Sequence, residues 1–371
     1  MMLTIPDFVR SAAAFVVVLG VLVFVHELGH YLAARWRGVH VEAFSIGFGR
    51  AIASWTDRQG TVWKLAWLPL GGYVKLHGQE RPEDVADEVR ARWLPGRTFH
   101  QKSVLSRAIV VAAGPVANFL LAAVLFAALF GTVGRPVSVP VIGDVVADGA
   151  AAKAGLRSGD RVRSIDGAAV SRFEDIQRIV SANPDRELTL RILRDGQEQT
   201  VAVMAGSRDA GQGRRAGLLG VRGGGTEFTK LNPLQAVVAG VTQTWDVTAQ
   251  TVAGLAQMLS GARTTDELGG PLRIAQLSGQ VAQLGLSSLI SFIAVLSVNL
   301  GLINLFPIPI LDGGHLLFYL AEAVRGRPLP PRAQEYGYRA GFALLACLFV
   351  FATWNDLTHL GLFRWVSGLI G

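Results

Sequence analysis

Four long apolar stretches divide the chain, and charged residues hardly interrupt them. Between Arg10 and Arg35 the only charged side chain is Glu27, there is none between Arg107 and Arg135 or between Arg273 and Asp312, and the fourth stretch is shorter. A helix that crosses a bilayer needs roughly 20 mainly apolar residues, with about 17 as the lower end. The pattern therefore predicts a multi-pass α-helical membrane protein with about four spans. We expect these spans at residues 8–35, 104–132, 286–320 and 338–356.

The composition agrees with a membrane protein. The chain has 371 residues, of which 50% are hydrophobic and only 17% are charged. Its formal net charge is +7, but basic residues with interleaved aromatic ones do not cluster, so nucleic acid is not expected as a partner. The first stretch lacks the basic start of a signal peptide, and its apolar run continues past His26. The single cysteine, Cys347, excludes a disulfide framework and a cysteine-based metal site.

Lysine and arginine residues near the span ends gather on one side of the predicted membrane. They are frequent in residues 35–107 and 322–340 and sparse near the other span ends. Because loops rich in these residues stay in the cytoplasm, both regions are expected to be cytoplasmic. Residues 134–286 and both chain termini are then expected to be periplasmic, in a bacterial inner (cytoplasmic) membrane.

The first span carries the motif His26-Glu27-Leu28-Gly29-His30. On a helix, residues i and i+4 share one face, so both imidazoles can bind one Zn²⁺ ion. The glutamate beside the first histidine can then take a proton from a water molecule. A helix end with polar side chains that reach the headgroups is the alternative, but it has no need of this spacing. The motif therefore predicts a catalytic metal site, with Glu27 as its base, near the cytoplasmic face.

A third metal ligand is expected from another part of the chain, because catalytic zinc usually has three protein ligands. Asp312 ends the third apolar stretch, just after Pro307 and Pro309, which break helical hydrogen bonding. The first and third spans run in the same direction, so Asp312 is expected to meet Glu27. His315 is a second candidate ligand, which could instead support Asp312. An aspartate that only caps a helix is the alternative for Asp312.

Three motifs in order make the chain resemble the site-2 protease family. They are H-E-L-G-H on the first span, G-P-V-A-N at residues 114–118 on the second, and N-x-F-P-x-P-x-L-D-G-G-H at residues 304–315. More narrowly, the chain is similar to the bacterial metalloproteases that include the regulator-of-sigma-E protease. The resemblance covers nearly the whole chain. It implies zinc bound by His26, His30 and Asp312, with Glu27 as general base.

The resemblance also implies a function and substrates. Family members cleave single-span membrane proteins inside the bilayer, usually after another protease has removed the outer domain. Expected substrates are anti-sigma factors or remnant signal peptides. Asn304 matches a family position that helps to hold the unwound substrate, and we group Pro307 and Pro309 of the same motif with it as substrate-binding residues.

Residues 38–78 are Gly-rich and alternate in polarity, which predicts a membrane-associated β-hairpin or small sheet. Trp55 and Trp63 suit an interfacial position. An exposed strand edge could hold an unwound substrate by β-addition, although a small sheet without a catalytic role is the alternative. Residues 79–103 are expected to form a cytoplasmic loop, with His77 and His100 as surface residues.

Residues 137–206 are soluble in character and resemble a PDZ domain, because they contain A-x-x-A-G-L-x-x-G-D-x-x-x-x-I-D-G at residues 151–167. Such a domain could bind a peptide on a sheet edge, but we favour a steric filter that excludes bulky substrates. Many relatives of the sigma-E regulator type carry two such domains, so a single one favours another branch of the family. Residues 230–284 are loosely amphipathic and are expected on the periplasmic side.

Two other functions remain open from the sequence. One is a membrane-anchored PDZ adaptor with a non-catalytic metal site, against which the intact Glu27 argues. The other is a metal or proton transporter, for which the four spans lack the repeated motifs that such proteins show. An intramembrane zinc endopeptidase is therefore the leading hypothesis.

Overall fold

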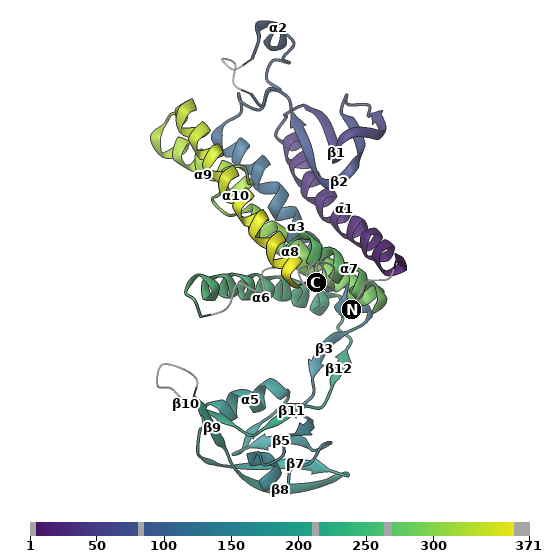
Figure 1. Ribbon diagram of the computed structural model, residues 1–371, viewed down its shortest axis with the longest axis vertical. Helices are drawn as coiled ribbons and strands as arrows, with labels where there is room; N and C mark the ends of the chain where they lie inside the picture. The colour runs from purple at the N-terminus through teal and green to yellow at the C-terminus, as the bar shows by residue number, and fades with distance from the viewer. Residues whose placement is uncertain (1–4, 81–84, 210–214, 263–268, 360–371) are drawn as a thin grey trace, which may run out of the picture. The chain divides into compact units, whose positions relative to one another are not determined.

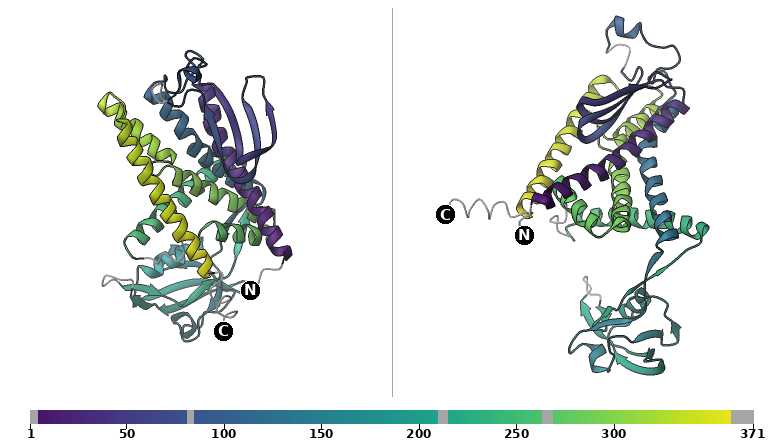
Figure 2. Two further views of the ribbon diagram at one scale, coloured as in Figure 1. Left: turned by 45° about the horizontal axis from the view of Figure 1, so that its top comes forward. Right: turned by 90° about the vertical axis from the view of Figure 1, so that its right-hand side faces the viewer.

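The computed structural model describes residues 5–80, 85–209, 215–262 and 269–359 (Figures 1 and 2). The chain separates into two compact units. Unit 1 comprises Met1–Leu129 and Pro233–Gly371, and unit 2 comprises Phe130–Asn232. Each unit is described by itself.

Unit 1 contains the four spans. Long helices occur at α1 (Ile5–Trp36), α3 (Val104–Thr132), α8 (Leu286–Asn304) and α10 (Pro331–His359). Each of these four helices is long and apolar enough to cross a membrane. The predicted class, a multi-pass α-helical membrane protein, is therefore confirmed.

Glycines let α1 and α3 approach closely. A Cβ atom on Gly29 would lie 2.3 Å from the carbonyl oxygen of Ala113, and one on Gly114 would lie 2.3 Å from Nε2 of His30. Small residues permit this kind of backbone contact between membrane helices. The glycines of the first two motifs thus bring His30 directly against α3.

The strands β1 (Val41–Thr56) and β2 (Val62–Leu76) form the predicted hairpin of unit 1, which lies beside α1 in Figures 1 and 2. Its register is unusual, because Phe44 pairs with both Trp63 and Val74. The two halves of β2 therefore flank the first half of β1. Phe44 is buried and packs in one apolar cluster with Tyr31 of α1, which fastens the sheet to the helix.

The segment after the hairpin contains the short helix α2 (Asp87–Arg90). His77, at the start of this segment, is buried rather than exposed, so the expected surface position is wrong. Its Nδ1 lies 2.8 Å from Oε1 of Glu42, and its Nε2 accepts a hydrogen bond from the backbone of Leu94 at 2.8 Å. The imidazole ties this segment to β1, a role that has no signature in the local sequence.

Three further helices complete unit 1, namely α6 (Pro233–Leu259), α7 (Pro271–Gln283) and α9 (Asp312–Arg325). The carboxylate of Asp356 in α10 is buried and accepts hydrogen bonds from the backbone N–H groups of Gly270, Leu272 and Arg273, at the start of α7. Since first-turn N–H groups of a helix have no partner within it, Asp356 satisfies them and joins the two helices.

Unit 2 is a small α+β domain, as its sequence resemblance to a PDZ domain implies. Its main sheet has the order β6-β5-β7-β8, with β5 (Arg161–Ile165), β6 (Ala168–Ala169), β7 (Glu187–Arg194) and β8 (Gln197–Met204). The helices are α4 (Ala150–Lys153) and α5 (Phe173–Ser181). Its core is a cluster of aliphatic side chains that includes Ile176, Leu188 and Leu219.

Three strand pairs complete unit 2. They are β3 (Arg135–Ser138) with β12 (Thr226–Thr229), β4 (Ile142–Val145) with β11 (Val221–Gly223), and β9 (Gly206–Asp209) with β10 (Arg215–Leu218). The unit therefore continues past residue 206, the end expected from the sequence. The reason is that β11 pairs with β4 and Leu219 is buried in the core.

Candidate metal centre

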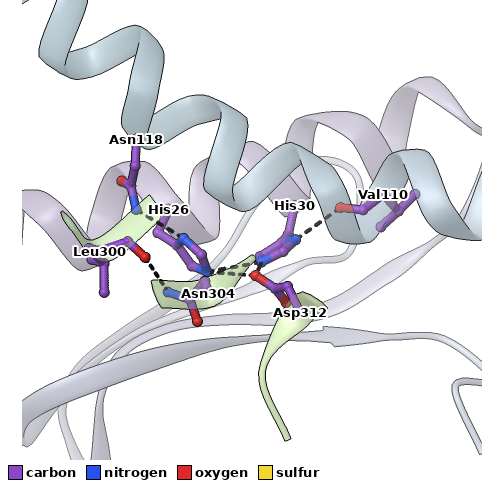
Figure 3. Close-up of polar contacts among 7 residues, drawn as sticks. All are labelled: His26, His30, Val110, Asn118, Leu300, Asn304 and Asp312. Atoms are coloured by element: carbon purple, nitrogen blue, oxygen red, sulfur yellow. Dashed lines mark hydrogen bonds and ion pairs between the residues drawn. The ribbon is translucent and has the colours of Figure 1, made fainter. Parts of the chain in front are cut away.

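Three metal-binding atoms meet where α1 and the start of α9 come together (Figure 3). Nε2 of His26 lies 3.2 Å from Nε2 of His30 and 3.2 Å from Oδ2 of Asp312. Nε2 of His30 lies 3.4 Å from the same carboxylate oxygen. With zinc–ligand bonds of about 2.0–2.1 Å, neighbouring ligands of a tetrahedral zinc ion lie about 3.3 Å apart. The three atoms thus have the spacing of one face of such a tetrahedron.

Hydrogen bonds hold His30 in the orientation and tautomer that a metal needs. Its Nδ1 lies 2.9 Å from the carbonyl oxygen of Val110, which can only accept, so Nδ1 carries the proton. Nε2 then presents its lone pair to the centre. Oδ2 of Asp312 is buried and has no hydrogen-bond donor. A buried carboxylate oxygen that faces an unprotonated imidazole nitrogen suits a bound cation, so the donor set fits zinc.

His26 is oriented by Asn118 of α3, a residue to which the sequence assigned no role. The side-chain nitrogen of Asn118 lies 3.1 Å from Nδ1 of His26, and its Oδ1 is buried without a partner. Amide oxygen and nitrogen exchange places by a half-turn of the side chain. In the turned orientation Oδ1 accepts the Nδ1 proton of His26 and leaves Nε2 free for a metal. A polar residue within an apolar span was the signal that could have revealed it.

Glu27 and the three ligand residues line one open cavity of about 360 Å³. Glu27 lies next to Gly72 of β2, where an added Cβ atom would come within 3.0 Å of its Cγ. Residues 72–74 and 76 line the same cavity. Glu27 thus lines a cavity whose wall also includes the metal-binding residues and a strand of the hairpin.

Of the other residues expected at the site, some line the cavity and some do not. Asn304 lines the cavity, and its Nδ2 donates to the carbonyl oxygen of Leu300 at 3.0 Å. Pro309 packs against α10, where a Cβ atom on Gly341 would lie 1.9 Å from its carbonyl oxygen. Pro307 is exposed, and neither proline lines the cavity. His315 lines the cavity but is not part of the three-residue cluster.

Unit 2 contains a separate groove of about 290 Å³ between α5 and residues 217–221. Phe173, Ile176 and Val180 line it from the helix. A Cβ atom on Gly217 would lie 2.0 Å from the carbonyl oxygen of Val180, so the absence of a side chain lets the two segments meet at this end. The groove provides space for a short extended peptide, which the sequence did not reveal.

Comparisons with known proteins agree with these features. A family model described as peptidase family M50 matches residues 14–348. A Rhizobium meliloti (strain 1021) protein named as a zinc metalloprotease is 44% identical over 97% of this chain and 100% of its own length. Protease RseP of Yersinia pestis is 34% identical over 94% of this chain and 99% of its own length. Among solved structures, the PDZ domain of an SdrC-like protein from Listeria monocytogenes has 15% identity and a TM-score of 0.20, and the match covers 23% of this chain and 85% of that domain.

The family match extends over most of the chain, and both relatives match over nearly their full length. The expected family, enzyme class and zinc cofactor are therefore confirmed. The chain belongs to peptidase family M50, the site-2 protease family, and is a multi-pass inner-membrane zinc metalloprotease.

Proposed function

We propose that the protein cleaves single-span membrane proteins within or near their membrane-spanning segment. The observation that carries this proposal is the cavity in which Glu27 and the three metal-binding atoms lie beside an edge of β2. His26, Glu27 and His30 belong to a helix that can span the membrane, so the chemistry takes place at membrane depth.

His26, His30 and Asp312 would hold the zinc ion in this proposal. Bound zinc would polarise the peptide carbonyl group and stabilise the negative charge that develops on its oxygen. Glu27 takes a proton from the attacking water molecule and passes it to the nitrogen of the leaving amine. Asn118 and the carbonyl group of Val110 keep the two imidazoles in their metal-binding orientation.

A helical substrate must be extended before its peptide bonds can react, and the hairpin offers a way to do this. Residues 72–76 pair with β1 along one edge only, and no other strand of the described chain pairs with them. Four of these five residues also line the cavity. An unwound substrate segment added to this edge would pass Glu27 and the metal-binding atoms. Asn304, which lines the same cavity, would contact the same segment.

The distribution of Lys and Arg supports one orientation in the inner membrane. In this orientation the hairpin and residues 322–340 are cytoplasmic, and the PDZ unit and both termini are periplasmic. The active site then lies near the cytoplasmic face. A substrate that has lost its outer domain, such as a cleaved anti-sigma factor or a remnant signal peptide, fits this arrangement.

The groove of unit 2 bears on how such substrates are selected. Its lining of apolar side chains from α5 together with polar groups such as Gln177 and Arg208 supports binding of an extended peptide end, in addition to the size exclusion that we favoured from the sequence. Replacing Leu218, a groove-lining residue that is 47% exposed, by Arg would place a charged side chain in the groove without changing the core. If this variant cleaves a substrate with a short outer tail more slowly but still does not cleave substrates with a bulky outer domain, the groove binds peptides in addition to any size exclusion.

Replacement of Glu27 by Gln tests the proposed cleavage. The purified full chain should keep about one zinc per molecule, measured by elemental mass spectrometry, and its cleavage of a single-span substrate should slow by a factor of about 10²–10⁴. Glu88→Gln, a change of the same kind on an exposed residue of α2, is the control and should keep full activity. Cleavage at the normal rate by the Glu27 variant would refute the proposal.

A further inference from the structure

A second polar cavity, of about 470 Å³, lies in unit 1 apart from the metal centre. Four separate segments form it: the last turn of α1, the link from α1 to β1, the turn between β1 and β2, and the segment before α3. Its lining includes Arg35, Arg58 and Arg97, together with His40 and Gln59. Neither the metal centre nor the hairpin edge uses any of these side chains.

In the part of the chain that the structure describes, the three guanidinium groups have no ion-pair partner, and Arg35 donates a hydrogen bond to the hydroxyl group of Tyr31 at 3.4 Å. The nearest acid of the turn, Asp57, already accepts hydrogen bonds from Tyr31 and Trp63, besides two from backbone groups of the turn. Three positive charges around one cavity repel one another unless an anion lies between them.

The cavity is built by fixed backbone rather than by free surface loops. The backbone N–H group of His40 donates to the carbonyl oxygen of Arg97 at 3.0 Å, which joins two of the four segments. Hydrogen bonds to Oδ1 of Asp57 fix the turn that carries Arg58 and Gln59. The arginine backbones are therefore held around the cavity before any ligand binds.

Two of the guanidinium groups also act on His40, whose side chain lines the cavity. Burial and the neighbouring His77 lower the pKa of His40, and Arg97 and Arg35 lower it further, against an opposing effect of Glu42. An imidazole kept neutral can donate a hydrogen bond to an anion without adding charge. With Gln59 it supplies polar groups beside the three charged ones.

The position of the cavity indicates the source of the anion. Arg35 lies in the last turn of α1, whose span ends at Trp36, and the side chain of Trp36 is 73% exposed. Trp55, on the neighbouring strand, is 57% exposed. Exposed tryptophans mark the level of the lipid headgroups in membrane proteins. Guanidinium groups bind phosphate oxygens through paired hydrogen bonds.

We propose that Arg35, Arg58 and Arg97 form a phosphate-binding site at the end of α1, which takes the headgroup of an anionic phospholipid or a free phosphate. Its occupant would connect the end of α1 with the turn of the hairpin and so steady the sheet whose edge borders the metal centre. The binding itself does not depend on the proposed proteolysis.

Lipid retention by the full-length protein tests this site. The protein is reconstituted in nanodiscs of phosphatidylcholine, with or without phosphatidylglycerol as a minor component. Native mass spectrometry then counts the phosphatidylglycerol molecules that stay bound to each protein. The double variant Arg58→Gln/Arg97→Gln should bind phosphatidylglycerol about thirty-fold more weakly, because each basic residue at a membrane surface raises the affinity for an anionic lipid by about five-fold. Both residues are exposed, so the protein should still fold.

The matched control is Arg50→Gln/Arg92→Gln, which removes the same charge from two exposed residues outside the cavity. Normal retention by the control and loss by the first variant support a headgroup site. If phosphatidylglycerol has no effect but inorganic phosphate raises the unfolding temperature of the natural protein and not of the Arg58/Arg97 variant, the site binds free phosphate. Equal losses in both variants, or no response of the natural protein to either probe, would overturn the proposal. Arg58→Gln alone gives a second measurement, with a loss near five-fold expected.

Discussion

The side chain of Asn118 meets His26 at 3.1 Å across the interface between α3 and α1. Asn118 is fully buried, and its backbone carbonyl oxygen accepts a hydrogen bond from Ser297 of α8 at 2.7 Å. Through this one residue, three spans meet at a ligand of the candidate metal centre. Its side chain fixes which nitrogen of His26 faces the metal.

Replacement of Asn118 by Leu should weaken zinc binding by a factor of about 10–100, because His26 loses the partner that fixes its ring. Asn118→Asp keeps an acceptor for the Nδ1 proton and should retain most of the affinity. Competition with a fluorescent zinc chelator measures both variants. Equal affinity in the Leu variant and the natural protein would show that Asn118 does not support the ligand.

The identity of the third ligand can be decided by comparing two alanine variants. Asp312→Ala removes one of the three converging atoms and should reduce the zinc content of the purified protein to well below one per chain. His315→Ala leaves all three atoms in place and should keep the metal. The reverse result, in which only the His315 variant loses zinc, would exclude Asp312 as the ligand.

The close contact between α1 and α3 predicts a strong effect of one methyl group. Gly29→Ala would place a Cβ atom 2.3 Å from the carbonyl oxygen of Ala113, so the helices must separate. We expect a loss of stability of about 2–3 kcal/mol, as for overpacked cores, together with lower zinc affinity. Thermal unfolding in detergent measures the change.

Gly20→Ala is the control for this substitution. It lies in the same helix, and a Cβ atom there would meet nothing within 4 Å. Because Ala favours helices more than Gly, this variant should be as stable as the natural protein or more stable by up to about 1 kcal/mol. If both variants behave alike, helix propensity rather than packing governs the two positions.

Unit 2 should lose stability in acid because of Asp160. Burial raises the pKa of this carboxyl group, but hydrogen bonds from Arg194 and from the backbone of Arg157 outweigh burial and hold the pKa below its ordinary value of 3.8. A carboxyl group with a lowered pKa stabilises the fold above its unfolded pKa. That contribution decreases below about pH 3.8 and is lost as pH falls through the native pKa.

Hydrogen exchange of residues 130–232 in the full chain, followed between neutral and acidic pH, measures this loss. In Asp160→Asn the protection should be lower at neutral pH and should change less in acid. Asp144→Asn, on an exposed strand position, is the control and should follow the natural protein. An unchanged acid response in the Asp160 variant would assign the pH dependence to other groups.

Local sequence predicted those parts of the fold that depend on one segment at a time. The four spans follow from apolar length, and His26 and His30 share a helix face because of their spacing alone. The contact of Asn118 with His26 depends on how α3 packs against α1; the local sequence marks Asn118 as a polar residue in an apolar span but does not identify its partner. The double pairing of Phe44 depends on register shifts in β1, and the strand β11 joins unit 2 only through its distant partner β4. The burial of His77 likewise depends on Glu42 and Leu94, which lie on other segments.

The two-sided pairing of β1 also has a consequence for turnover. With the second half of β2 on one side and the first half on the other, the first half of β1 is a central strand, and residues 72–76 are held on one side by hydrogen bonds within the same chain. A segment that joined their outer edge would be the outermost strand and paired along a single side. After cleavage, each shorter fragment would keep only part of that pairing, so the fragments should dissociate before the sheet is disturbed. With substrates bound as proposed, the hairpin would release its products and keep its own strand pairing for the next substrate.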